Sequence, residues 1–147
     1  MRQTKAEIYL HFVWATYQRM PLVAPEIERD VHRCIESEAK RLKCATLAIG
    51  GMPDHVHLFV RMPTRISAAM LMQQVKGVSS TFVRDQLKTD GYFGWQDGYG
   101  VSRPHVDRVI AYVKNQKNHH ENGNVWDQWE ATDQEVQRPE SPVREDG

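Results

Sequence analysis

The chain has 147 residues and carries as many Lys and Arg as Asp and Glu residues, 19 of each, so its formal net charge is zero. This length is typical of one domain with a substantial core, and the lack of an apolar run of about 18 residues argues against a membrane-spanning helix. The first residues lack the apolar stretch of a secretion signal, and two cysteines show no pairing pattern. We therefore expect a cytoplasmic protein with reduced Cys34 and Cys44.

The charge is divided unevenly along the chain. Residues 1–120 hold 17 Lys and Arg against 11 Asp and Glu, a net of +6, whereas residues 121–147 hold 2 against 8, a net of −6. A basic body of this kind can bind a polyanion such as a nucleic acid. We predict a domain over residues 1–121, followed by an acidic and largely disordered tail over residues 122–147.

The first half of the chain predicts three strands and a helix. Residues 8–15 alternate with a period of two, which indicates a strand. Apolar residues spaced by three and four over residues 25–42 predict an amphipathic helix. Residues 44–50 predict a second strand, and the glycines and proline of residues 50–54 predict a tight turn. The apolar run of residues 55–62 then completes a hairpin.

The second half predicts two further helices around a short strand. Ser67 is placed to cap a helix over residues 68–87, and the glycine-rich, aromatic residues 93–100 predict a short strand and a loop. Residues 102–104 are predicted to open a last helix that runs to about residue 120. This order predicts an α+β fold in which helices pack on one antiparallel sheet, as in ferredoxin-like and RNA-recognition domains, with a C-terminal helix that bears a tyrosine.

Four residues in two segments suggest chemistry on phosphate. His55 and His57 are two apart on a predicted strand, so their imidazoles project from one face, as two ligands of one metal ion must. Tyr112 and Gln116 are four apart on a predicted helix and also share a face. A phenol has a pKa of about 10 and needs a metal or a base to attack phosphate near neutral pH. Structural histidines and a core-edge tyrosine beside a surface amide remain the simpler alternative.

A second polar set lies on the predicted helix of residues 68–87. Lys76, Ser79 and Ser80 share one face of that helix, which suits contacts to DNA phosphates. The alternative is a solvated face whose hydroxyls bond to their own helix. Arg61 and Arg103 are predicted to extend a basic track for the same DNA.

Several segments together resemble the insertion-sequence transposases of the single-tyrosine HUH family, which are relatives of the REP-associated tyrosine transposases. The matching segments follow the family's order and cover about residues 5–120. They are His11-Phe-Val-Trp14, Gly51-Met-Pro-Asp-His-Val-His-Leu-Phe-Val60, Lys76-Gly-Val-Ser-Ser80, Trp95-Gln-Asp-Gly-Tyr-Gly100 and Tyr112-Val-Lys-Asn-Gln-Lys-Asn-His-His120.

The resemblance implies a ferredoxin-like fold and a defined reaction. His55, His57 and Gln116 would hold Mg²⁺ or Mn²⁺, with no nucleotide cofactor. Tyr112 would be the nucleophile that forms a 5′-phosphotyrosine and releases a 3′-hydroxyl. The substrate would be single-stranded DNA beside a hairpin at the ends of a mobile element. Family members are homodimers, in which the tyrosine helix of one subunit can complete the site on the histidines of the other.

The chain departs from the family at two places, and two other functions stay open. Tyr17 stands where the family often has a basic residue, and the stretch after Gly100 is shorter than usual. A histidine-triad nucleotide hydrolase would need a third alternating histidine where Phe59 stands. A domesticated protein that binds DNA hairpins but no longer cleaves them is the remaining alternative.

Overall fold

The computed structural model describes residues 8–103, 110 and 112–115. The strands and long helices follow one another in the order strand, helix, strand, strand, helix, strand. They are β1 (Ile8–Ala15), α1 (Pro25–Arg41), β2 (Ala45–Met52), β3 (His55–Met62), α2 (Ala68–Phe82) and β4 (Gly100–Ser102), with the short helical turns η1 (Tyr17–Arg19) after β1 and η2 (Val83–Leu87) after α2. The bounds of β1 and β3 agree with the predicted strands.

The four strands form one antiparallel sheet in the order β2-β3-β1-β4. The two central strands pair along their whole length, from Ile8 opposite Met62 to Ala15 opposite His55. β2 pairs with β3 through an irregularity between Thr46 and Ala48, where one extra residue is accommodated on β2. This topology confirms the predicted ferredoxin-like α+β fold.

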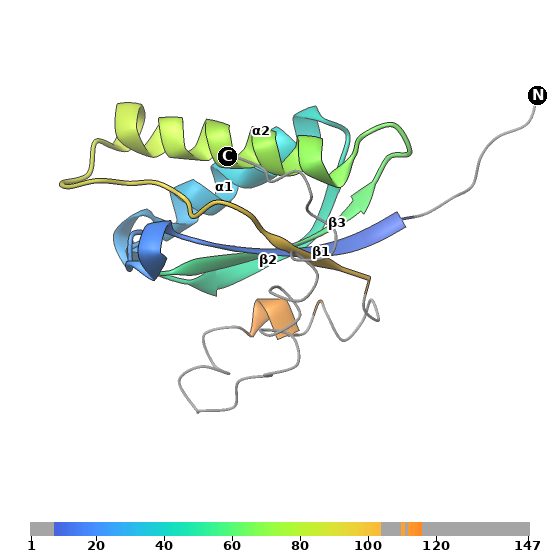
Figure 1. Ribbon diagram of the computed structural model, residues 1–147, viewed down its shortest axis with the longest axis horizontal. Coiled ribbons are helices and arrows are strands. Elements are labelled where there is room, and N and C mark those ends of the chain that lie inside the picture. The colour runs from blue at the N-terminus through green and yellow to red at the C-terminus, as the bar shows by residue number, and fades with distance from the viewer. Residues whose placement is uncertain (1–7, 104–109, 111, 116–147) are drawn as a thin grey trace, which may run out of the picture.

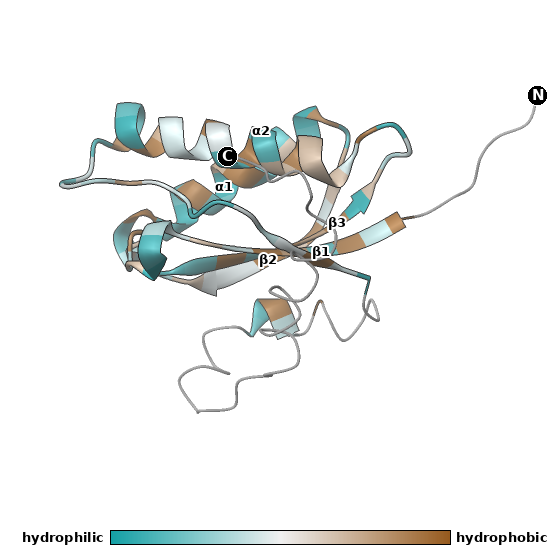
Figure 2. Ribbon diagram, in the orientation of Figure 1, coloured by the Kyte–Doolittle hydropathy of each residue, from teal (hydrophilic) through white to brown (hydrophobic). Residues whose placement is uncertain are grey.

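The two long helices cover one face of the sheet, and the helical residues around position 112 lie on the other side (Figure 1). The main core lies between the helices and the sheet. Its fully buried members include Phe12, Val31, Ile35, Val56, Leu58, Val60, Leu71, Met72 and Val75. Brown and teal segments alternate along α1 and α2 in Figure 2, as expected of helices with one buried face. In the part of the chain that the structure describes, no helix is both long and apolar enough to cross a membrane.

Local signals position both helices. Pro25 is in the first turn of α1, where a missing N–H costs nothing. The Ser67 hydroxyl accepts a 3.0 Å hydrogen bond from the backbone N–H of Met70 and caps α2 as predicted. The α-helix ends at Phe82, and the chain continues to Leu87 as one wider turn, so the predicted helix over residues 68–87 is correct only in part.

Two predicted boundaries are wrong. The tight turn predicted over residues 50–54 begins later, because β2 continues through both glycines to Met52. Ser102 is the last residue of β4 and does not open a helix. The strand includes this residue because Ser102 pairs with His11 of β1. The rest of the predicted last helix and the acidic tail lie mostly outside the described residues.

Candidate active site

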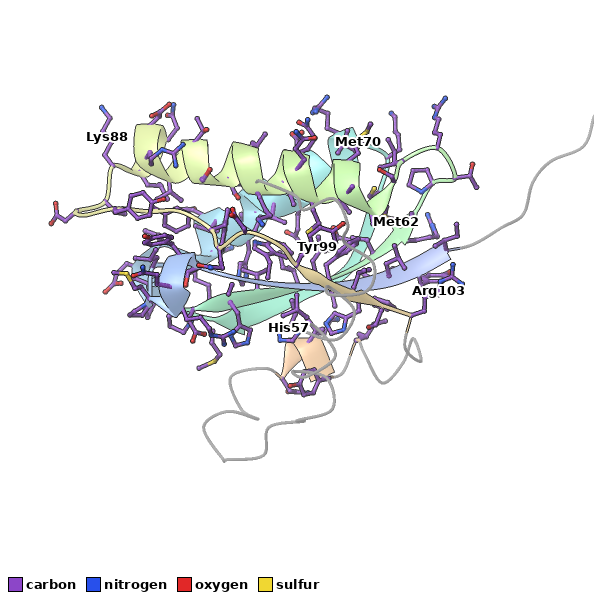
Figure 3. All side chains as sticks on the ribbon, viewed as in Figure 1. His57, Met62, Met70, Lys88, Tyr99 and Arg103 are labelled. Atoms are coloured by element: carbon purple, nitrogen blue, oxygen red, sulfur yellow. The ribbon has the colours of Figure 1, made fainter. Side chains whose placement is uncertain are left out.

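The histidines of β3 project from the face of the sheet opposite the helices. Val56 and Leu58 alternate with them and enter the main core. His55 and His57 therefore share the other face, as their spacing predicts. Their side chains are only 1% and 0% exposed, and their ring centroids are 5.1 Å apart. Figure 3 shows His57 between the sheet and the helical segment around residue 112.

A carboxylate fixes the orientation of His55. Its Nδ1 lies 2.7 Å from Oδ1 of Asp54, and Nη2 of Arg19 lies 3.5 Å from the other carboxylate oxygen. The hydrogen bond with His55, reinforced by the charge of Arg19, lowers the pKa of Asp54 despite its partial burial. Because a carboxylate only accepts hydrogen bonds, Nδ1 is the donor in this pair, and in the neutral ring Nε2 then carries the lone pair.

A third histidine orients His57. Nδ1 of His57 lies 2.9 Å from Nε2 of His11 on β1, and the two rings stack at 5.1 Å with an interplanar angle of 21°. His11 is buried, with 2% exposure. The antiparallel register places Val13 directly opposite His57, so His11 is its diagonal neighbour on the same face. When His57 donates from Nδ1, its Nε2 likewise carries the lone pair.

The two Nε2 atoms are suitable ligands for a divalent metal ion. Both lie buried on the same face of the sheet, and each ring is held through its other nitrogen, which is how histidine ligands are usually oriented. Two neutral imidazoles leave coordination positions for phosphate oxygens. Within the described ranges, no three His, Cys, Asp or Glu residues form a metal-binding group. Gln116, the predicted third ligand, lies outside those ranges.

Tyr112 lies beside the histidines of its own chain. Its side chain is 2% exposed, and its ring centroid is 5.6 Å from that of His57, with the ring planes at 77°. The structure therefore brings the predicted nucleophile together with a predicted metal ligand, although the stretch after Gly100 is short.

A glycine on β2 allows the tyrosine segment to lie close to the sheet. Val113 is fully buried and packs with Ala48 and Phe59 in a small second core. A Cβ atom at Gly50 would collide with the backbone carbonyl of Val113. Gly50 is also the residue opposite His57 in the pairing of β2 with β3. Its missing side chain thus allows the backbone contact that places Tyr112 beside the histidines.

Lys76 is buried on the helix side of the sheet. The side chain is 0% exposed, and its ammonium donates hydrogen bonds of 2.9 and 3.0 Å to the carbonyl oxygens of Gln96 and Gly98. These bonds tie α2 to the loop before β4. We therefore do not propose this lysine as a DNA contact, because the buried charge already holds the loop.

The two serines predicted to contact DNA are buried in the same layer. Ser79 donates to the carbonyl of Val75 and accepts a 2.9 Å hydrogen bond from the indole nitrogen of Trp95. Ser80 donates to the carbonyl of Gly77 within α2. This arrangement corresponds to the alternative in which hydroxyls bond to their own helix, and we do not propose Ser79 or Ser80 as DNA contacts.

The two arginines named with them are exposed. Arg61 shares the face of β3 that carries His57, four residues away. Arg103 follows the last residue of β4. Their contact with DNA stays a prediction.

The sequence interpretation missed three residues of the site, namely His11, Asp54 and Arg19. Asp54 directly precedes a histidine, and this adjacency was a usable signal. His11 required the register between β1 and β3, two strands that lie 46 residues apart at this contact. Arg19 required the shape of the turn after β1, which the residue types there do not reveal.

Comparisons with solved structures agree with the fold. The chain is similar to the crystal structure of a putative transposase from Deinococcus radiodurans R1, with a TM-score of 0.63, 20% identity, and coverage of 84% of this chain and 95% of that one. It is also similar to a REP-associated tyrosine transposase bound to a REP hairpin, with a TM-score of 0.61, 12% identity, and coverage of 85% and 74%. At these identities the likeness shows the fold. No curated protein sequence matches the chain.

A match to a sequence family identifies the family of the chain, which structural similarity alone does not. Residues 4–116, well over half of the chain, match the family described as IS200-like transposases. This match supports a role as a DNA transposase. The chain belongs to the family of IS200-like transposases.

Proposed function

We propose that this transposase cleaves and rejoins single-stranded DNA beside hairpins through a covalent bond between Tyr112 and a 5′-phosphate. One observation carries the proposal: the Tyr112 ring is buried against His57, with ring centroids 5.6 Å apart. A phenol in contact with a histidine that is suited to bind metal is where a phosphate can meet both a nucleophile and a cation.

The proposed reaction conserves the energy of the DNA backbone bond. The phenol of Tyr112 loses its proton as its oxygen bonds to phosphorus, the bond between phosphorus and the 3′ oxygen breaks, and that oxygen takes up a proton to leave a 3′-hydroxyl. Rejoining reverses these events, because a 3′-hydroxyl attacks the phosphotyrosine and releases the phenol. No nucleotide cofactor is needed, since the covalent intermediate keeps the phosphoester.

His55 and His57 would hold Mg²⁺ or Mn²⁺ through Nε2, and Gln116 would be the third protein ligand. When bound, the ion would neutralise charge on the scissile phosphate and help to orient it for in-line displacement. The protein's own contribution is orientation. Asp54 holds one imidazole and His11 the other, with Nδ1 distances of 2.7 and 2.9 Å.

The proposed substrate is single-stranded DNA that contains a hairpin. One structural neighbour is a REP-associated tyrosine transposase bound to a REP hairpin, and the net charge of +6 over residues 1–120 favours a polyanion. Arg61 and Arg103 are the proposed phosphate contacts among the exposed residues. We also propose that residues 1–121 form the catalytic domain and that residues 122–147 are a separate acidic tail.

We propose a homodimer in which the tyrosine helix can serve either site. The placement of Tyr112 beside His57 of the same chain supports assembly of the site within one subunit. Exchange of the segment between two copies would place Tyr112 beside the histidines of the partner subunit. Mixing a Tyr112→Phe subunit with a His57→Ala subunit tests this directly, because only exchange between subunits restores cleavage in the mixture.

Covalent capture tests the proposed reaction. The protein is incubated with Mg²⁺ or Mn²⁺ and labelled single strands from the DNA that flanks its gene, and a denaturing gel is run. A protein–DNA band is expected that disappears with EDTA and in Tyr112→Phe. Tyr92→Phe is the matched control, since it removes the hydroxyl of a tyrosine that is 59% exposed.

The variants also separate cleavage from binding. Tyr112→Phe is expected to retain binding to the hairpin on a native gel, because only the nucleophilic oxygen is lost. A hairpin-specific shift without any adduct from the unmodified protein would refute the cleavage proposal and support the binding-only alternative.

A further inference from the structure

A pair of exposed tyrosines forms one corner of the molecule. Tyr17 in η1 is 40% exposed and Tyr92 is 59% exposed, and their ring centroids are 5.3 Å apart with planes at 71°. Met20, which is 42% exposed, follows η1 directly. We call Tyr17 and Tyr92 the aromatic corner. Exposed aromatic rings are a common platform for the unpaired bases of single-stranded nucleic acids.

The segment that carries Tyr92 is firmly anchored. Its neighbours Phe93 and Trp95 are 2% and 6% exposed and belong to the main core. The Tyr92 ring lies over Gly94, where a Cβ atom would collide with it. The loop is therefore anchored by its buried residues, and the exposed Tyr92 ring packs on the outer side of its backbone at Gly94. A platform that is ordered before binding loses less entropy when a ligand arrives.

The same loop is tied to η1. The backbone N–H of Tyr17 donates to the carbonyl of Gly94 at 3.0 Å, and the backbone N–H of Gln18 donates to Oε1 of Gln96 at 2.8 Å. The side chain of Gln18 donates to the hydroxyl of Tyr17 at 3.2 Å. These bonds hold η1 and the Tyr17 side chain against the loop that carries Tyr92.

The backbone of η1 is strained, and its conformation sets the directions of the Tyr17 and Arg19 side chains. Gln18 and Arg19 both have positive φ angles, 52° and 53°, which non-glycine residues rarely adopt. Such strain persists where the surrounding structure enforces it, and it is concentrated at functional sites. Here the turn presents Tyr17 outward, while the guanidinium of Arg19 lies 3.5 Å from the carboxylate of Asp54, which is paired with Nδ1 of His55.

We propose that the aromatic corner stacks an unpaired base of the single-stranded DNA, and that Arg19 contacts the phosphate backbone between this base and the histidines. The side chain of Arg19 is 54% exposed, and a guanidinium has five donors, so it can keep Asp54 and also bind a phosphate. Continuity with His55 and the positive charge between the two sites favour DNA over an apolar protein partner. The inference rests on the proposed function for the identity of the strand.

Binding to strands that lack single bases tests the platform. The probe is a fluorescein-labelled single strand from the DNA that flanks the gene, together with versions in which one base at a time is replaced by an abasic site. Tyr92→Ala is expected to weaken binding to the intact strand by about tenfold, and Tyr92→Phe to bind normally. Met70→Ala, which truncates a 44% exposed side chain on α2, is the control and is expected to bind normally.

The abasic strands identify stacking as the cause. At one position, removal of the base is expected to weaken binding by the unmodified protein and to abolish the difference between it and Tyr92→Ala. Tyr17→Ala is expected to give the same pattern at that position. Equal losses at all positions, or no loss for either alanine variant, would overturn the platform.

Covalent capture on the same strands keeps the two proposals separate. If the unmodified protein forms an adduct that requires Tyr112 but Tyr92→Ala binds every strand normally, only the platform fails. If no adduct forms but the position-specific effect of Tyr92→Ala persists, only the cleavage proposal fails. Lack of binding to any strand by the unmodified protein would overturn both.

Discussion

The two faces of the sheet are built from the same strands, but one face forms the main core and the other carries the candidate active site. On β3, Val56, Leu58 and Val60 enter the core beneath the helices, whereas His55 and His57 alternate with them on the other face. Burial of the first set removes apolar surface from water and supplies much of the folding free energy. The second set gains its order from directional hydrogen bonds to Asp54 and His11. Stability and candidate chemistry are therefore separable along a single strand.

The largest expected effect breaks the helix-covered face. Phe12 is 0% exposed in the main core, and Phe12→Ala is expected to lower the free energy of unfolding by about 3–5 kcal/mol. Arg61→Ala, on the other face, is the control and should change it by less than about 0.5 kcal/mol. Urea unfolding measures both. Equal losses would contradict the division between the faces.

The next effect acts on the histidine face alone. Gly50→Ala is expected to displace the Val113 carbonyl and with it Tyr112, which would slow covalent capture by up to about 100-fold, as small misplacements of reacting groups do. Gly77→Ala is the control, because nothing lies within 4 Å of a Cβ there, and this helix substitution should stabilise the protein by up to about 1 kcal/mol. Unchanged capture by Gly50→Ala would show that Tyr112 reacts from another position.

His11 tests whether the support of a metal ligand can be separated from folding. His11→Ala removes the 2.9 Å partner of His57 and is expected to weaken Mn²⁺ binding by about 10- to 100-fold, the usual cost of losing such support. His11→Gln, which can still accept a hydrogen bond, is expected to restore part of the affinity. Calorimetric titration with Mn²⁺ measures this without relying on catalysis. Full affinity in His11→Ala would show that His57 needs no such support.

The smallest expected effect concerns Lys76, a charged residue that is buried between the helices and the sheet. Lys76→Met keeps the length of the side chain but removes the donor to two carbonyl oxygens, and a stability loss on the order of 1–2 kcal/mol is expected. Affinity of the folded protein for the DNA hairpin should be unchanged. Normal stability with weaker hairpin binding would instead restore the phosphate contact that the sequence suggests.

Periodicity predicted most of the fold because it reports local geometry. The alternation over residues 8–15 and the apolar run over residues 55–62 gave the bounds of β1 and β3. The two-residue spacing of the histidines gave their shared face, and Ser67 marked the start of α2. The glycines of β2 were predicted to form a turn, because the role of Gly50 depends on Val113, a residue far along the chain. Residue spacing placed Lys76 and Ser79 on one helix face but could not show that this face is covered by the loop of residues 95–98. His11 escaped notice because its partner depends on strand register.

The extra residue accommodated on β2 between Thr46 and Ala48 has a consequence for how this fold can change by insertion and deletion. β2 already absorbs one unpaired residue without losing its place in the sheet. On β3 the same event would turn both histidines into the main core and place Val56 and Leu58 on the face of the candidate site, because one residue of slippage exchanges the faces. An insertion or deletion of one residue in the inner strand β3 would therefore disrupt the site. The edge strand β2 already accommodates one extra residue while the histidines keep their face.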